Sequence, residues 1–303
     1  MKELWKAICR PSGKITDIFL IGMILATAIS LLGTLLTEVL FLVLRVKPFL
    51  TGLLGNGDTA VFLLMYLSFL GIWLVFFAVI SVFKANRPIW KCLSFRREGN
   101  GMGAIATGLL LGFVTNGFCI LMACLMGDLK LYYYKFDPLP FFLFLFAVFV
   151  QSGAEEIVVR CYLYQKLRRR YRHPAVALLI SSLYFMLMHI GNDNVSVSAL
   201  ADLFITGILF ALYVYYYDSL WTAIMFHTGW NFTQSFLFGL PNSGLVSKYS
   251  LFKLDAASAR NGFFYNVGYG VEGSKGSIVV LLVVTVIVLF LNYGKREKRD
   301  LWG

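Results

Sequence analysis

Long apolar runs constrain the fold of this chain more than any other feature of its sequence. A helix needs about 20 apolar residues to cross the roughly 30 Å hydrocarbon core of a bilayer. Eight runs of about that length, separated by polar or Gly/Pro-rich breaks, cover 15–45, 59–83, 102–126, 139–167, 174–190, 197–217, 219–240 and 276–293. The sequence is 59% hydrophobic and 14% charged, which excludes a water-soluble protein. We therefore expect an all-α, polytopic integral membrane protein with about eight transmembrane helices, in contact with membrane lipid.

The formal net charge of +11 is carried by short basic clusters between the apolar runs. Four Lys or Arg residues lie in the N-terminal tail, five in 84–101, five in 166–172 and four in the C-terminal tail. Basic residues collect on the cytoplasmic side of membrane proteins, so this pattern predicts that both termini are cytoplasmic. Clusters in these positions serve as topology signals, and nucleic acid is not an expected partner.

The domain organisation follows from the same runs. We expect one membrane domain over 1–303, with 139–240 as its chemical core. The segment 241–275 is the only long stretch between apolar runs, and its Gly, Ser and Asn content predicts an exposed, non-cytoplasmic loop. The five cysteines form no CxxC pair, so neither a disulfide framework nor a thiolate metal site is expected. Gly108 and Gly112 have the small-xxx-small spacing that permits close helix contact.

An acidic pair inside the fourth apolar run is the most unusual group. Each ionisable side chain near the bilayer centre costs about 2.5–3.5 kcal/mol unless it is paired or wetted. Glu155 and Glu156 follow a dozen apolar residues, and Arg160 comes four positions after Glu156. That spacing favours a helical ion pair between Glu156 and Arg160. Glu155 lies about 100° away around the helix axis and is left without this partner.

Two of the three histidines lie within apolar runs. His189 ends the fifth run, and His227 lies in the seventh, one turn before Asn231. A single histidine in a membrane helix is usually a packing residue, but two histidines together with Glu155 and Asn231 indicate chemistry. Counting helix rise from the expected cytoplasmic boundary puts Glu155 roughly 16 Å deep, His227 roughly 12 Å and His189 roughly 24 Å. His189 agrees with the others only if its helix ends inside the membrane and the polar run 191–196 lines a cavity.

These residue types suit peptide hydrolysis. A carboxylate in a low-dielectric cavity is a better general base for a water molecule, and Glu155 meets this description. The other route is a zinc ion held by Glu155, His189 and His227, a His₂Glu set like that of zinc hydrolases. The HExxH motif is absent, and we favour direct activation of water by glutamate, with no cofactor and zinc as the alternative.

Three motifs resemble one membrane peptidase family. EExxxR at 155–160, FxxxH at 185–189 and HxxxN at 227–231 occur in this order on separate apolar runs. Together they resemble the CAAX protease and bacteriocin-processing (CPBP) family, which includes the type II CAAX prenyl endopeptidases. The resemblance covers about 139–240, the fourth to seventh helices.

The resemblance implies specific residue roles. Glu155 and His189 would activate the attacking water, and His227 and Asn231 would stabilise the oxyanion. Glu156, the second glutamate of the first motif, is also expected to be a catalytic residue. Arg160 and Phe185 are expected to be supporting residues.

The resemblance also implies a substrate class and a location. The substrate would be a membrane-associated peptide or lipidated protein, with a role in bacteriocin or peptide-pheromone maturation or in self-immunity. We expect a bacterial plasma membrane protein, and the sequence leaves the oligomeric state open. We also expect the cavity to open to the cytoplasm, beside the basic run 166–172 and Asp218, where cations would favour a free carboxylate or acidic flank of the peptide.

Two other functions fit the same buried residues. A proton-coupled transporter also uses intramembrane Glu and His, but its usual inverted repeat is not visible in this sequence. A non-catalytic immunity or scaffold protein could keep the fold of a peptidase. Replacing Glu155 with Gln separates these functions, because it abolishes cleavage by an enzyme and leaves a scaffold unaffected.

Overall fold

All eight apolar runs form helices in the computed structural model, which describes residues 8–95, 98–298 and 300–302. The predicted all-α membrane fold is confirmed. The α-helices are α2 (Phe19–Val43), α3 (Val46–Leu54), α4 (Gly57–Leu67), α5 (Leu70–Val82), α6 (Met102–Leu125), α7 (Pro138–Glu156), α8 (Tyr164–Arg170), α9 (Pro174–Leu187), α10 (Val197–Tyr217), α11 (Leu220–Phe232) and α12 (Lys275–Leu291). Five basic residues of the charge count lie outside the described residues: Lys2, Lys6, Arg96, Arg97 and Arg299.

The smaller elements lie mostly between these helices. Two π-helical segments continue α7 and α11, η4 (Ile157–Leu163) and η5 (Thr233–Leu237). Short 3₁₀ segments are η1 (Ile15–Asp17), η2 (Lys84–Leu93), η3 (Glu98–Asn100), η6 (Ala256–Ser258) and η7 (Val271–Gly273). The strands β1 (Leu131–Tyr133) and β2 (Phe252–Leu254) pair antiparallel, with Leu131 opposite Leu254.

Not every predicted run is long enough to cross a bilayer. Among the described residues, five helical stretches are long and apolar enough, namely Phe19–Val43, Gly57–Val82, Met102–Leu125, Pro138–Arg170 and Val197–Tyr217. The other three runs form the shorter helices α9, α11 and α12, of 14, 13 and 17 residues. Counting apolar runs therefore gives about eight helices, but not eight full-length spans.

Local sequence signals explain where several helices begin. Pro138 and Pro174 occupy the first positions of α7 and α9, where a missing backbone N–H is tolerated and the fixed φ suits a helix. Asn56 and Ser196 accept hydrogen bonds from the first turns of α4 and α10. Arg45, between α2 and α3, has a φ of 53° and turns the chain. The helix α3 that follows is short, so the search for long apolar runs did not predict it.

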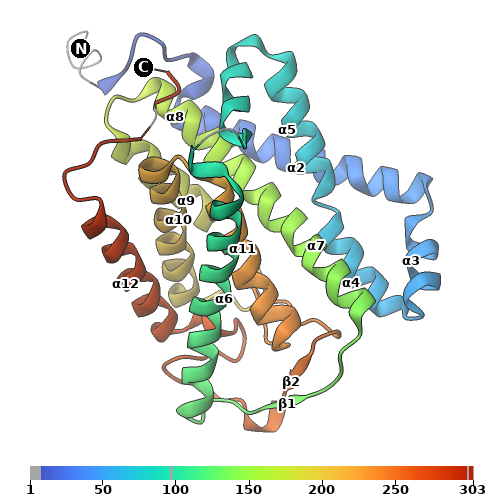
Figure 1. Cartoon of the computed structure of the whole chain (residues 1–303). Helices are drawn as coiled ribbons and strands as arrows, with labels where there is room; N and C mark the ends of the chain where they lie inside the picture. Colours follow the sequence, from blue (N-terminus) through green and yellow to red (C-terminus); the bar gives the residue numbers. More distant parts are fainter. Residues whose placement is uncertain (1–7, 96–97, 299, 303) are drawn as a thin grey trace.

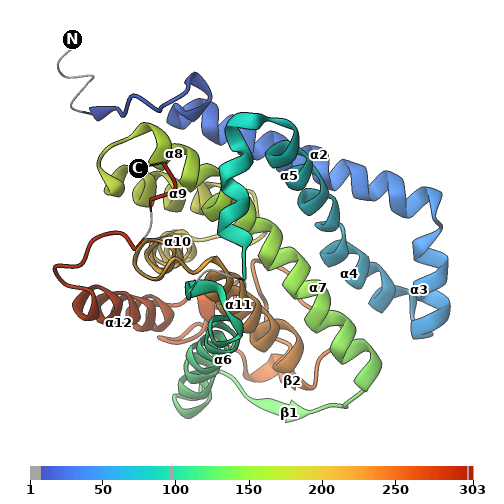
Figure 2. The same cartoon turned by 45° about the horizontal axis from the view of Figure 1, so that its top comes forward.

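The helix α7 crosses the middle of the molecule, between the α4–α5 stretch and the α6–α11 pair (Figures 1 and 2). Gly112 allows α6 to approach α11 closely, because a Cβ atom there would lie 2.1 Å from the backbone oxygen of Phe226. Gly108 is equally tight, at 2.5 Å from the oxygen of Thr222. The small-xxx-small pair thus has a structural role, because it packs against α11, the helix that carries His227. The spacing alone could not show this role.

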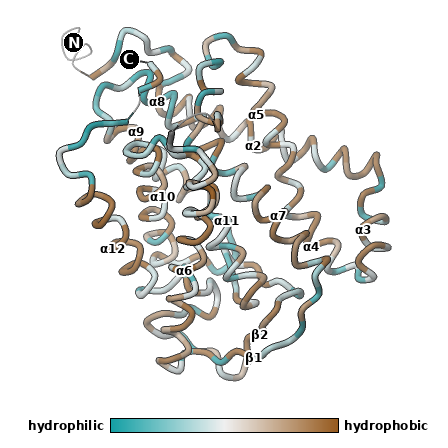
Figure 3. Tube along the Cα trace, in the orientation of Figure 1, coloured by the Kyte–Doolittle hydropathy of each residue, from teal (hydrophilic) through white to brown (hydrophobic). Residues whose placement is uncertain are grey.

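The first and last described residues lie at one end of the molecule, together with α8, and the strands lie at the other end (Figure 1). Figure 3 shows hydrophilic residues concentrated at the terminal end and hydrophobic residues along the helices. The basic run of α8 is buried there and ion-paired. Arg169 donates two hydrogen bonds to Asp17, at 2.5 and 2.6 Å, and Arg168 pairs with Glu297. These arginines therefore join the two terminal segments to the core.

The segment 241–275 is much less exposed than its composition suggests. Tyr249, Tyr265 and Tyr269 are buried within it, and so is Glu272. The expectation of an exposed loop is wrong for these parts, because the chain folds back against the ends of the helices instead of extending into solvent. The side of the membrane on which it lies remains a prediction.

Candidate functional site

The acidic pair lies at the end of α7, where the helix passes into the π-helical segment η4. Adjacent residues on a helix differ by about 100° in direction, so the two carboxylates have different neighbours. Glu155 lines a cavity of about 420 Å³, whereas Glu156 is fully buried behind it. The inference that Glu155 lacks the partner of Glu156 agrees with this geometry.

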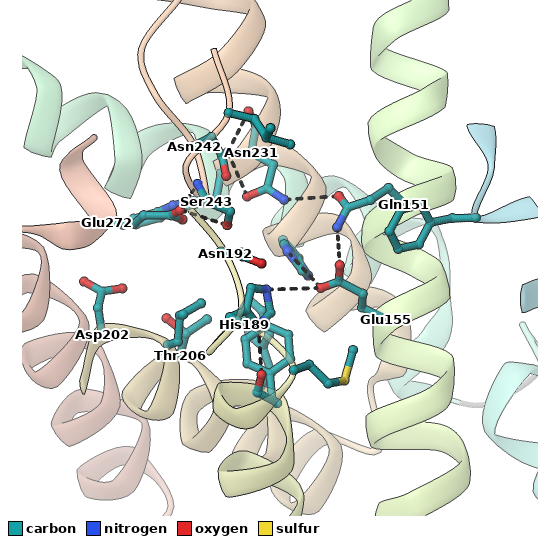
Figure 4. Close-up of a pocket in the computed structure, with 18 of the residues that line it drawn as sticks. Gln151, Glu155, His189, Asn192, Asp202, Thr206, Asn231, Asn242, Ser243 and Glu272 are labelled. Atoms are coloured by element: carbon teal, nitrogen blue, oxygen red, sulfur yellow. Dashed lines mark hydrogen bonds and ion pairs between the residues drawn. The ribbon is translucent and has the colours of Figure 1, made fainter. Parts of the chain in front are cut away.

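Glu155 faces both intramembrane histidines, and Figure 4 shows it beside His189. Its Oε2 atom lies 3.9 Å from Nε2 of His189 and 3.9 Å from Nε2 of His227. All three side chains line the cavity, and each is less than a tenth exposed. The structure thus brings together, from α7, α11 and the turn after α9, three groups that are up to 72 positions apart in the sequence.

Each histidine is oriented by a contact to its other ring nitrogen. Nδ1 of His189 lies 2.8 Å from the backbone oxygen of Phe185, and only a protonated Nδ1 can make this hydrogen bond. Neutral His189 therefore presents an unprotonated Nε2 to the cavity. Nδ1 of His227 lies 3.1 Å from Oε1 of Glu156. Since the carboxylate accepts, His227 donates from Nδ1 and its Nε2 also faces the cavity.

Glu156 and Arg160 form the predicted ion pair at 3.1 Å, and both side chains are fully buried. The Arg160 guanidinium also donates to the backbone oxygen of Gly207 at 3.1 Å. It lies over the rings of Phe185 and Phe210, 4.4 and 5.5 Å from their centres. Neither Glu156 nor Arg160 lines the cavity, so they hold His227 and Phe185 in place from behind.

A chain of amides reaches Glu155 from the other side. Asn242 donates to the side-chain oxygen of Asn231 at 3.2 Å, and Asn231 donates to Gln151 at 3.3 Å. Gln151 in turn donates to Oε1 of Glu155 at 2.5 Å. Gln151 was missed by the motif reasoning, although its position one turn before Glu155 on the same helix was a usable signal. Asn242 had no such signal, because it comes from the segment expected to be an exposed loop.

The opposite wall of the cavity carries further polar residues that the sequence reasoning missed: Asp202, Thr206, Ser243 and Glu272. Asp202 lies inside the apolar run 197–217, so the rule that singled out Glu155 applied to it as well. The loop after α9 does line the cavity at Gly191, Asn192 and Asp193. The helix α9 ends at Leu187, before the polar loop. His189 follows this end closely and therefore lies at the depth of Glu155.

The cavity is not placed beside the basic run. The loops 191–193 and 242–245 and the residue Glu272 line it, and they lie near helix ends on the side opposite α8. Among the residues described as lining it, none is Lys or Arg. The expected cation-lined mouth next to 166–172 and Asp218 is therefore wrong, because the arginines of α8 are used in ion pairs with the terminal segments.

The His₂Glu set is wider than a zinc site requires. Zinc bonds to nitrogen and oxygen are about 2.0–2.2 Å, which places tetrahedral ligand atoms about 3.3–3.6 Å apart. Both Glu155–histidine distances are 3.9 Å. In the described part of the chain, no group of three or more His, Cys, Asp or Glu side chains is arranged to hold a metal ion. As placed, the three side chains do not fit zinc without moving.

Fold and site together define a polytopic α-helical membrane protein that encloses a carboxylate–histidine centre between its helices. Residues 137–233 match the family described as type II CAAX prenyl endopeptidase Rce1-like, which confirms the resemblance drawn from the three motifs. The match includes Glu155, Glu156, Arg160 and both histidines. No curated protein and no solved structure matches the chain. Residues 137–233 are thus similar to the CAAX-type intramembrane proteases in general, and they lie within a polytopic α-helical membrane protein.

Proposed function

We propose that this protein is an intramembrane endopeptidase that hydrolyses a peptide bond through a water molecule activated by Glu155 and His189. The observation that carries the proposal is the convergence of the Glu155 carboxylate on two imidazole Nε2 atoms inside a buried cavity. A carboxylate, two imidazoles and several amides are the groups that acid–base catalysis of amide hydrolysis uses.

The spacing suits a bridging water. A water oxygen about 2.8 Å from two acceptors that are 3.9 Å apart subtends an angle of about 90°, close to its own H–O–H angle. Both hydrogens would then point at Glu155 and His189, and a lone pair would face the cavity. When the water oxygen attacks the carbonyl carbon, Glu155 accepts its proton and passes it to the departing amine nitrogen. The products are a carboxylic acid and an amine.

His227 and Asn231 are suited to the developing oxyanion. In its protonated form His227 donates Nδ1–H to Glu156 and has Nε2–H available for a substrate oxygen. Asn231 uses one amide hydrogen for Gln151 and has a second one. Donors that are already oriented by other contacts stabilise charge without reorganisation in the transition state. Glu156 serves here as a positioning residue for His227.

The substrate and the location are parts of the same proposal. A cavity buried among membrane helices suits a membrane-associated peptide or lipidated protein, and the family resemblance suggests bacteriocin or peptide-pheromone maturation or self-immunity. We place the protein in a bacterial plasma membrane with both termini in the cytoplasm, as the distribution of basic residues favours.

The test is cleavage by Glu155→Gln. Purified wild-type and variant proteins in liposomes are incubated with a library of hydrophobic peptides, and new termini are identified by mass spectrometry. We expect Glu155→Gln to lower cleavage about 10²–10⁴-fold, the usual contribution of a general base. Gln can still accept from Gln151, so folding should be kept. Glu38→Gln, the same change at an exposed position of α2, is the control and should cleave normally. Equal cleavage by Glu155→Gln and wild type would overturn the assignment.

A further inference from the structure

The cavity has an acidic wall that the proposed chemistry does not use. Asp202 of α10 and Glu272 of η7 line it on the side away from Glu155 (Figure 4). Asp202 is 2% exposed and Glu272 is 5% exposed. Buried carboxylates are normally paired or coordinate a cation, because an isolated one is expensive to desolvate. Two of them in one cavity are therefore unusual.

Asp202 is the clearer of the two. Its Oδ2 atom has no hydrogen-bond partner among the described residues. The hydroxyls of Thr206 and Ser277 interact with the Asp202 carboxyl but carry no charge, and Thr206 lines the same cavity. A buried carboxylate at the wall of a cavity, with two uncharged hydroxyls beside it, is placed to receive a charged donor from a molecule that enters the cavity.

Glu272 is held in position by the loop over the cavity. Its Oε1 atom accepts hydrogen bonds from the backbone N–H of Ser243 at 2.5 Å and from the Ser243 hydroxyl at 3.0 Å. Burial raises the pKa of Glu272 above its usual range, although both hydrogen bonds oppose this. A neighbouring positive charge would favour the ionised carboxyl, and among the described lining residues only His189 and His227 could supply one.

We propose that Asp202 and Glu272 form a subsite that binds the ammonium or guanidinium group of the peptide substrate. This inference rests on the proposed peptidase function and names the substrate class. The cation comes from a Lys or Arg side chain near the scissile bond or from the free N-terminus of the peptide. A free carboxylate at this place would face like charges, so the preference for an acidic flank expected from the sequence is reversed.

Binding to an inactive protein tests the subsite without requiring cleavage. The probes are fluorescent hydrophobic peptides in which one position, moved along the chain, is Lys, norleucine or Glu, each with a free or an acetylated N-terminus. The protein is Glu155→Gln in an uncharged detergent. At one register we expect Lys to bind about ten- to a hundredfold more tightly than norleucine, as for a charge-assisted hydrogen bond, and Glu more weakly than either. If the peptide N-terminus is the ligand, acetylation removes the preference and the Lys position does not matter.

Adding Asp202→Asn to this protein should bring the Lys-to-norleucine ratio close to one. Asp128→Asn, which changes another buried carboxylate that does not line the cavity, should keep the ratio. Glu272→Gln is the second variant if Asp202→Asn does not fold. Equal binding of Lys, norleucine and free N-terminal peptides at every register overturns the subsite, and so does a preference that survives both variants. Cation-selective binding without cleavage by the wild type would instead contradict the peptidase proposal alone.

Discussion

Glu156 and His227 are joined across two helices by a contact of 3.1 Å between the carboxylate Oε1 and the imidazole Nδ1. This contact fixes which nitrogen of His227 faces the cavity, and the same carboxylate also holds the Arg160 guanidinium. One buried side chain thus sets both the orientation of a proposed catalytic group and the charge balance of the core.

We expect Glu156→Gln to affect activity and stability separately. Cleavage should fall at least about tenfold, as when the carboxylate behind a catalytic histidine is lost. Unfolding should become easier by about 3–5 kcal/mol, because Arg160 keeps a buried charge without its partner. The double variant Glu156→Gln/Arg160→Met should recover stability but not activity. Thermal unfolding with a thiol-reactive dye is the measurement, since four of the five cysteines are buried. Recovery of both properties would contradict a positioning role for Glu156.

Metal chelators should leave cleavage intact. The 3.9 Å spacing between Glu155 and each histidine suits a water molecule better than zinc. Dialysis of the active protein against strong chelators, followed by elemental analysis, tests this expectation, with a known zinc protease treated in parallel as the control. Stoichiometric zinc and loss of activity on its removal would make Glu155, His189 and His227 metal ligands.

The contact between α6 and α11 should not tolerate a larger residue at Gly112. A Cβ atom there would overlap the backbone of α11 at Phe226, and α11 carries His227. We expect Gly112→Leu to lower the melting temperature and to reduce cleavage by shifting His227. Gly117→Leu on the same helix meets open space and is the matched control. Similar melting temperatures for both variants would show that the two helices can separate without cost.

The ion pair between Asp17 and Arg169 predicts a pH dependence of stability. Burial acts to raise the pKa of Asp17, but the hydrogen bonds and charge of Arg169, with Lys166, hold it below the usual 3.8. A carboxyl with a lowered folded pKa stabilises the protein above its unfolded pKa and loses this effect as pH falls through the folded value. Asp17→Asn should therefore melt earlier than wild type at pH 7; the difference should shrink as pH falls below about 3.8 and disappear once pH is below the folded pKa. Asp58→Asn, which changes an exposed pair with Lys248, should have little effect at either pH.

The proposed topology predicts labelling from opposite sides. Lys84 and Lys130 are exposed near the two ends of the helices. In a background without the five native cysteines, Lys130→Cys should react with an impermeant thiol reagent in intact cells. Lys84→Cys should react only after the membrane is opened. The reverse pattern would place both termini outside.

The apolar runs predicted most of the helical fold, because a membrane helix needs a long apolar stretch of a kind that water-soluble domains rarely contain. The three motifs also led to Glu155, His189 and His227. Each can be recognised individually in the sequence, because burying an ionisable side chain in an apolar run is unusually costly. Asn242 and Glu272 were not predictable in this way. They reach the cavity through the folding of the 241–275 segment, and such long-range packing of a polar loop leaves no periodic pattern.

Gln151 and Asp202 are a different case, since the sequence did contain signals for them. Gln151 lies one turn before Glu155, and Asp202 interrupts an apolar run. Neither belongs to one of the three motifs, so attention to the motifs passed over them. The position of the cavity was mispredicted because charge counting shows on which side a loop lies, not which side chains its arginines bind.

The π-helical segment Ile157–Leu163 separates the acidic pair from the arginines of α8. A π-helical turn accommodates more residues than an α-helical turn, so each residue rotates the following chain by less than the roughly 100° of an α-helix. The segment therefore sets the rotational phase between Glu155 and Arg169. Removing a single apolar residue from it would keep every functional side chain and still turn α8 away from Asp17. Among related chains, selection would then preserve the length of this stretch more strictly than the identity of its residues.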